Sequence, residues 1–181
     1  MTAVPKPQYN TVDESLALPE AETERTELIY GEIVGMGAPT LSHQELSYGL
    51  HRTIDDHIRA NHGNCKVHEA AGVRLHDETL VIPDLMVVCD PDKLKGSYCI
   101  GAPDWIIEIL STNRSHDLRT KLGLYQDAGV REYWIVDPKN EKTLVYHFER
   151  SDFPAIYTFD TPIPVGIYGG AFTVRIAELL G

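Results

Sequence analysis

Two acidic residues stand inside otherwise apolar segments, and their type and setting indicate metal-dependent chemistry. Residues 80–88 are apolar on both strand faces except at Asp84, and residues 105–110 are apolar except at Glu108. Continuous apolar segments of this length are typical of central strands buried on both faces. A carboxylate there loses its hydration unless a cation or hydrogen-bond donors replace the water. Because carboxylate oxygens are the ligands that Mg²⁺ prefers, we predict a shared Mg²⁺ site. The alternative is that each acid pairs with an arginine or caps a strand end.

A lysine that could assist such a site follows on the next predicted helix. Asp117, Lys121 and Tyr125 recur every four residues and therefore share one face of a helix that Ser115 is placed to cap. Beside a metal-bound phosphate, a lysine orients the attacking water or offsets developing negative charge. The alternative is an exposed salt bridge between Asp117 and Lys121, worth about 0.3–0.5 kcal/mol.

The elements that must position these residues follow from periodicity and capping signals. Four apolar residues at four-residue spacing (Leu46, Leu50, Ile54 and Ile58) predict an amphipathic helix from a Ser42 cap to about His62. Pro83 has no N–H to give to a sheet, so the backbone is expected to be irregular just before Asp84. The other elements expected are a short helix after Thr11, strands on either side of Gly31, strands over 65–75, 80–89 and 104–111, a helix ending at Ala128, and strands over 133–136, 143–149 and 155–160.

This order predicts a mixed α/β (α+β) sheet with helices packed on it. We expect an acidic amino-terminal arm with a short helix (1–26) and one domain over 27–181.

The 181 residues hold 27 acidic against 16 basic ones, a net charge of −11 that disfavours non-specific attraction to nucleic acid. No apolar run reaches the ~20 residues that span a bilayer, and no secretory signal is evident, so the expected location is the cytoplasm. Three cysteines without a CxxC pair disfavour a disulfide framework or a structural zinc site.

Taken together and in order, several fragments resemble the Uma2 family, also known as DUF820, of restriction endonuclease-like proteins. The resemblance extends from about residue 11 to 180, and the order and spacing of the fragments are more specific than any one of them. The fragments are Glu27-Leu28-Ile29-x-Gly31-Glu32, Ser42-His43, Pro83-Asp84, Gly101-Ala102-Pro103-Asp104-x-Ile106-Ile107-Glu108-Ile109-Leu110-Ser111, and Ser115-x-Asp117-x-x-x-Lys121-x-x-x-Tyr125-x-x-x-Gly129-Val130-x-Glu132-Tyr133-Trp134-Ile135-Val136-Asp137-Pro138.

The resemblance implies a fold of the PD-(D/E)XK nuclease superfamily. Its restriction-endonuclease-like core is a helix, three strands, a second helix and a strand, here with additional outer strands. Asp84 matches the Asp of the PD element, and Glu108 matches the acid of the (D/E)XK element. Leu110 stands where the pattern expects lysine, and Lys121 on the following helix is the natural substitute.

Three further residues are assigned supporting parts in the same site. Glu32 is expected to supply an additional acid from the amino-terminal part of the core. Asp117 is expected to hold the ammonium group of Lys121. His43, in the first turn of its helix, fits either a functional role or a solvated helix start.

The function that the resemblance implies is Mg²⁺- or Mn²⁺-dependent endonuclease cleavage of DNA. One alternative is a nuclease-like binding or assembly module that no longer cuts, which the acidic balance and Leu110 favour. Another is a hydrolase of small phosphate esters, although the sequence has no small-ligand phosphate loop.

We also expect a homodimer, whose outer strands supply interface residues, and a methyltransferase partner if the protein is a restriction enzyme. The proposed interface residues are Val145, Tyr146, Phe148, Tyr157 and Phe159, and the basic residues near the site in sequence are Arg114, Arg119, Arg131 and Lys139.

Overall fold

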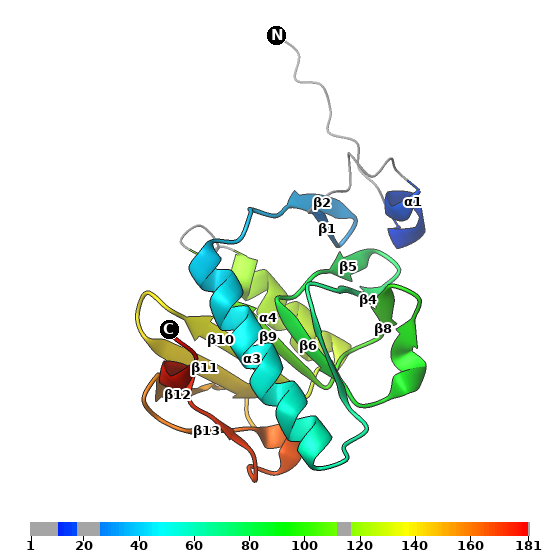
Figure 1. The fold of residues 1–181 in the computed structure, drawn as a ribbon. Helices are drawn as coiled ribbons and strands as arrows, with labels where there is room; N and C mark the ends of the chain where they lie inside the picture. Colours follow the sequence, from blue (N-terminus) through cyan, green and yellow to red (C-terminus); the bar gives the residue numbers. More distant parts are fainter. Residues whose placement is uncertain (1–10, 18–25, 112–116, 181) are drawn as a thin grey trace.

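A six-stranded central sheet separates two helices, α3 (Leu41–Ala60) and α4 (Asp117–Ala128), which cover its opposite faces (Figure 1). The computed structural model describes residues 11–17, 26–111 and 117–180. In spatial order the central sheet contains β12 (Ala155–Thr158), β11 (Lys142–His147), β10 (Glu132–Asp137), β9 (Trp105–Ile109), β6 (Leu85–Val88) and β3 (Lys66–Glu69). The mixed α/β fold class predicted from the sequence is therefore confirmed.

A second sheet packs beside the face of the central sheet that carries α4. It is also mixed, because β4 pairs in parallel with β8 and antiparallel with β5. In spatial order it contains β2 (Glu32–Gly35), β1 (Thr26–Ile29), β5 (Thr79–Val81), β4 (Gly72–His76), β8 (Tyr98–Ile100) and β7 (Leu94–Lys95). This sheet accounts for the strands that a restriction-endonuclease-like core does not require.

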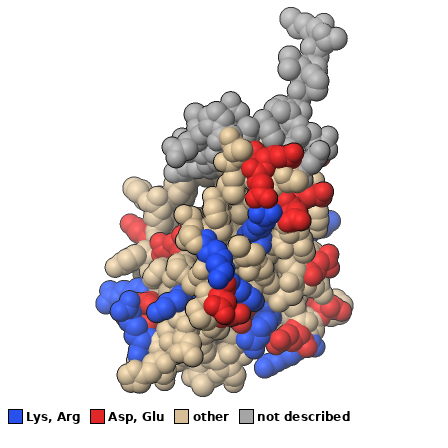
Figure 2. Space-filling view, turned by 90° about the vertical axis from the view of Figure 1, so that its right-hand side faces the viewer, with Lys and Arg blue, Asp and Glu red and all other residues tan. Residues whose placement is uncertain are grey.

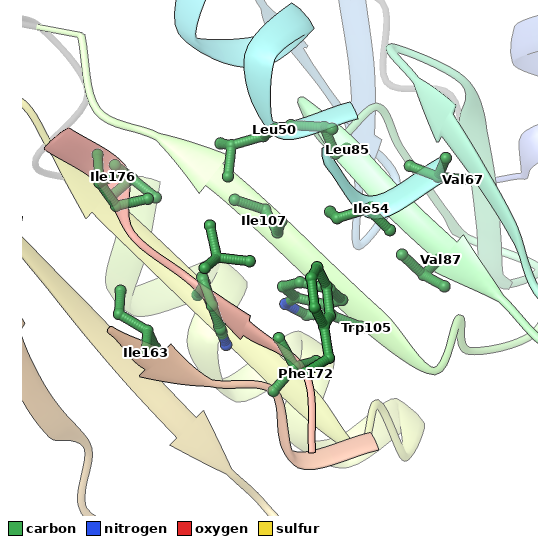
Figure 3. Packing of buried hydrophobic residues seen from close by; sticks show 14 of the residues in the cluster. Leu50, Ile54, Val67, Leu85, Val87, Trp105, Ile107, Ile163, Phe172 and Ile176 are labelled. Carbon is green, nitrogen blue, oxygen red and sulfur yellow. The ribbon is translucent and has the colours of Figure 1, made fainter. Parts of the chain in front are cut away.

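Helix α3 is amphipathic as predicted, but it begins earlier. Its cap is Thr40, whose hydroxyl accepts a hydrogen bond from the His43 backbone N–H at 3.2 Å, so the prediction of a Ser42 cap is wrong by two residues. The four apolar residues predicted to form its buried face all lie in the core. In Figure 3 two of them, Leu50 and Ile54, lie against Leu85 and Ile107 of the central sheet.

The strands predicted over 65–75 and 80–89 are each divided between the two sheets. The first becomes β3 in the central sheet and β4 in the second, and the second becomes β5 in the second sheet and β6 in the central one. The two crossing points meet, since the Ala70 backbone N–H donates to the Asp84 carbonyl at 3.1 Å. Residues 82–84 belong to no strand, as Pro83 predicted. Asp84 therefore lies at a corner between sheets and not in mid-strand.

Strand register brings Asp84 next to Glu108. Strands β6 and β9 are antiparallel with Leu85 opposite Ile107, and one step further along the same register Asp84 falls opposite Glu108. Strand β9 then pairs in parallel with β10, and α4 forms the connection between them. Within the central sheet the chain order is α3, three strands, α4 and a strand, followed by the outer strands β11 and β12.

Part of the predicted amino-terminal arm packs on the second sheet. Thr11 forms the predicted capping box with Glu14 at the start of α1 (Val12–Leu16). Val12 is fully buried against Leu28 and Leu80, and its backbone N–H donates to the Asp77 carbonyl at 2.7 Å.

The cysteines correct one expectation. Cys65 and Cys89 form a disulfide between the ends of β3 and β6, so the prediction against disulfides missed this bond. Antiparallel pairing of Lys66 with Val88 places the two cysteines opposite each other, although 24 positions separate them in the chain. Spacing rules for short cysteine motifs do not detect such a cross-strand pair.

The outer strands also differ from their expected role. Val145, Tyr146 and Phe159 are buried in the core of this chain, so the prediction that they form a subunit interface is wrong. The large apolar side chains exposed in this region are Phe153 and Ile156. Among the described helices, none has the length and apolar character needed to cross a membrane.

Candidate active site

Glu108 lies on β9 facing α4, and two donors from that helix meet on one of its oxygens. The Lys121 ammonium group lies 3.0 Å from Glu108 Oε1, and the Tyr125 hydroxyl donates to the same oxygen at 2.9 Å. Glu108 is only 3% exposed and Lys121 2%. Because Lys121 and Tyr125 are one helical turn apart, a single face of α4 supplies both donors. The predicted alternative of an exposed Lys121 salt bridge is therefore excluded.

A third acid, Glu27 on β1, completes the buried cluster. Its Oε1 accepts hydrogen bonds from Lys121 Nζ at 2.8 Å and from the Ile82 backbone N–H at 2.7 Å. Glu32, the acid expected from this part of the chain, is exposed on β2 opposite Ile29 and has no contact with the cluster among those described. Glu27, and not Glu32, is thus the acid that this part of the chain brings to the cluster, and it is buried together with Leu28 and Ile29.

Asp84 joins the site from the corner between the sheets. Its Oδ2 accepts a hydrogen bond from the Ile109 backbone N–H at 2.7 Å and lies 3.1 Å from His43 Nε2. His43 projects from the first turn of α3. Each covering helix therefore contacts one of the two neighbouring acids, α3 through His43 at Asp84 and α4 through Lys121 at Glu108. The His43 and Asp84 side chains are 12% and 11% exposed, which makes Asp84 more accessible than Glu108.

The cluster holds more negative than positive charge. Burial, together with the neighbouring Asp84 and Glu27, raises the pKa of Glu108 to about 7 against the lowering effect of Lys121. Burial also raises the pKa of Tyr125 well above its ordinary value, so its hydroxyl remains a donor. Three carboxylates beside one lysine form an arrangement that an additional cation would stabilise.

The donor set fits a hard cation with few protein ligands. Across residues 11–17, 26–111 and 117–180, no three His, Cys, Asp or Glu side chains are grouped to hold a metal ion. Asp84 and Glu108 are the two neighbouring carboxylates, and Ile109, whose backbone N–H donates to Asp84, directly follows Glu108. Mg²⁺ typically binds through one or two carboxylates and keeps several waters, so this set suits it better than a metal needing four side chains.

Two neighbouring cavities open beside the site, and His43 and Ser111 lie in the walls of both. The first cavity, about 540 Å³, is lined by Asp84, Ile82 and residues of the β2–α3 connection and α3. The second cavity, about 520 Å³, is lined by Ile109, Leu110, Asp137 and Lys139 among others. Asp84 lines the first cavity but not the second, so a substrate in the first cavity reaches its exposed side, whereas Glu27 and Lys121 line neither cavity.

The basic residues near the site in sequence do not gather there in space. Arg131 pairs with Asp104 and Glu149, and of the three that the structure describes, Arg119, Arg131 and Lys139, only Lys139 lines one of the two cavities. Arg114 and Ser115 lie outside the described residues, and α4 begins at Asp117, of whose side chain nothing is described. On the face that carries β4 and β8, basic and acidic side chains are interspersed (Figure 2).

Sequence reasoning missed Glu27 and Tyr125 as members of this cluster. A signal existed for Tyr125, which follows Lys121 by one helical turn, whereas Glu27 opens the same acidic fragment as Glu32 and nothing local singles it out. Tyr133 and Trp134, which follow in the same fragment, are fully buried.

Comparison with known proteins places this chain in a family. The sequence model of the Uma2 family, described as "Putative restriction endonuclease", matches residues 12–160. Two Synechocystis proteins named only as uncharacterized, sll1609 and slr1290, are 27% and 25% identical over 76% and 75% of this chain and 80% and 72% of their own. A crystal structure described as a putative nuclease belonging to DUF820, from Anabaena variabilis, superposes with a TM-score of 0.79 and 22% identity over 94% of this chain and 97% of that one. The fold, the site and the extent of the sequence match agree: this chain belongs to the Uma2 family.

Proposed function

We propose that this protein is a metal-dependent endonuclease that hydrolyses DNA phosphodiester bonds. The observation that carries the proposal is the convergence of Asp84, Glu108 and Lys121, from three separate parts of the chain, with Asp84 in the wall of the first cavity. Family membership supports a nuclease-like enzyme. The metal, the DNA substrate and the residue roles are our inference from the geometry.

Asp84 and Glu108, with the Ile109 carbonyl, would hold Mg²⁺ or Mn²⁺. When bound, such a cation supplies a Lewis acid for a phosphate oxygen and lowers the pKa of a bound water. The Ile109 N–H fixes Asp84 through Oδ2, which orients the carboxylate toward the cavities. Neutralisation by a cation would also favour the ionised form of Glu108, whose pKa burial otherwise raises.

Lys121 would offset negative charge that develops on the phosphate and orient the attacking water through Glu108. Its position explains how a chain with Leu110 at the usual lysine position keeps an ammonium group at the site. His43 lies on the opposite side of Asp84, at the junction of the cavities. There its imidazole would position Asp84 and donate to a phosphate oxygen.

The test is cleavage of plasmid and single-stranded DNA with Mg²⁺, with Mn²⁺ or with EDTA. Wild-type protein should cut only with a metal. Asp84→Asn and Glu108→Gln keep the side-chain shape but remove a charge, and each should lower the rate by on the order of a thousandfold. The matched control is Glu132→Gln, the same substitution at a buried acid far along the sheet, which should keep the cleavage rate.

Two results would contradict the proposal. One is cleavage in EDTA at the rate seen with Mg²⁺. The other is full activity of Asp84→Asn or Glu108→Gln in protein whose unfolding transition shows that it is folded.

One observation favours a binding module that does not cut. Lys121 is nearly inaccessible and bridges two carboxylates, as a purely structural ion pair would. Under this alternative no DNA is cut with any metal. Binding of Mn²⁺, followed by calorimetry with wild type and Asp84→Asn, then separates a retained metal site from a lost one.

A further inference from the structure

The first cavity offers an apolar surface directly beside Asp84. Its walls include Met36, Pro39 and Ile82, together with the ring of Tyr48, which is 63% exposed. Its volume of about 540 Å³ falls within the ~300–1,000 Å³ typical of sites for small organic molecules. An exposed aromatic ring at the rim of such a cavity is suited to stack on a flat, uncharged ring system.

The same cavity has polar groups suited to the edge of a heterocycle. Gln44, Ser47 and Glu69 line it together with the apolar residues. An amide both donates and accepts hydrogen bonds, a hydroxyl does the same, and a carboxylate accepts them. Nucleobases carry donors and acceptors side by side on one edge and apolar faces above and below.

A backbone hydrogen bond connects the wall of the first cavity to Asp84. Ala70, in that wall, has a left-handed backbone with φ of 46°, and its N–H donates to the Asp84 carbonyl. A non-glycine residue in this conformation persists only where the surrounding structure holds it. The cavity wall and Asp84 are thus connected, so a group bound in the cavity has a fixed distance to the carboxylates.

For a nuclease with this net charge, a pocket for a base is a source of affinity that does not depend on charge. With a net charge of −11, the protein gains little from broad contacts with phosphates. Stacking of a base on an aromatic side chain does not depend on net charge, and contributes on the order of tenfold in affinity per base.

We propose that the first cavity binds one unpaired nucleobase of the substrate, beside the phosphate held at Asp84. The inference rests on the proposed nuclease function and specifies its substrate. A paired base is held in its stack and cannot enter a cavity of this kind without being extruded, so single-stranded or locally unpaired DNA is the preferred substrate.

Binding measured without cleavage tests this proposal. Fluorescence anisotropy, with Ca²⁺ in place of Mg²⁺, compares three labelled probes of one length: an oligothymidylate, its duplex with oligoadenylate, and a base-free deoxyribose phosphate chain. The oligothymidylate should bind at least about tenfold more tightly than either of the others. Tyr48→Ala should remove most of this preference and Tyr48→Phe should keep it. Phe153→Ala, at a residue 81% exposed and outside both cavities, should change nothing.

Equal affinity for the oligothymidylate and the base-free chain would overturn the proposal, and so would equal affinity for the duplex. An equal loss by Tyr48→Ala on the base-containing and base-free probes would also overturn it. A wild-type protein that cuts no DNA but still shows the Tyr48-dependent preference would defeat the nuclease function and leave the base site standing.

Discussion

The central sheet buries one glutamate near each end of its β9–β10 pair, and the groups that surround the two carboxylates differ. Glu132 is 1% exposed, and each of its oxygens accepts one neutral donor, Trp134 Nε1 at 2.7 Å and the Ile167 N–H at 2.8 Å. His147 lies 3.9 Å from the same carboxylate, beside a cavity of only about 30 Å³. Glu108 instead shares Lys121 with Glu27 and has Asp84, which lines the first cavity, as a second acidic neighbour.

The comparison shows that burial alone does not identify a catalytic acid. At Glu132, neutral donors replace the lost hydration and the ring of Trp134 fixes the carboxylate in the core. At Glu108, negative charge is concentrated where solvent and substrate can approach from Asp84. Concentrated like charge beside a cavity is the more specific indication of function.

Removing the lysine should produce the largest loss of stability. Lys121→Met keeps a similar volume but leaves Glu27 and Glu108 buried without their cation, and we expect a loss of about 3–5 kcal/mol in the free energy of unfolding. Urea denaturation measures it. Arg119→Met, at an exposed position of the same helix, is the control and should change stability by less than about 0.5 kcal/mol. If Lys121→Met lowers the free energy of unfolding by no more than Arg119→Met does, water must reach the cluster.

The second-largest effect expected is a dependence of stability on pH that Glu108 causes. In metal-free buffer, Glu108 has a folded-state pKa of about 7 against an ordinary 4.5, so the folded protein holds a proton that the unfolded chain releases. Its contribution is complete below pH ~4.5 and is lost as the pH rises through ~7, a change on the order of 3 kcal/mol. Thermal unfolding across this range should show stability falling with pH, and Glu108→Gln should flatten the curve. A curve that Glu108→Gln leaves unchanged would contradict this assignment.

The smallest expected effect is at the second glutamate. Glu132→Gln replaces one acceptor by an NH₂ group, which leaves either Trp134 Nε1 or the Ile167 N–H without its partner. We expect a loss of about 1–3 kcal/mol in chemical denaturation, with the DNA cleavage rate unchanged. Lost cleavage in a folded Glu132→Gln protein would show that the two regions are coupled and would weaken the contrast between them.

Much of the fold was predictable because its signals are local. The capping box at Thr11 and the apolar spacing of α3 depend on residues within a few turns of each other. The division of 65–75 and 80–89 between two sheets was not predictable from periodicity. An apolar run has the same pattern whether it stays in one sheet or bends into another, and only Pro83 marked the bend.

The site was predictable in part for the same reason. Asp84 and Glu108 stood out because a charge interrupts an apolar run, and Lys121 because of its spacing on a helix. Glu27 did not stand out, since it lies in an acidic stretch where nothing local distinguishes it from Glu32. Its burial depends on β1 pairing with β5, and its contact with Lys121 spans 94 positions.

The sequence by itself determined the family, the order of the elements and the acids that an apolar strand cannot hold without compensation. Tertiary structure alone decided which acid faces the lysine, that Tyr125 shares an oxygen with it, and that Cys65 meets Cys89. It also decided that Asp84 lies in the wall of a cavity. Local patterns set conformation through backbone and desolvation energies of neighbouring residues. Pairs far apart in the chain are chosen only when strand register and helix packing fix every side chain at once.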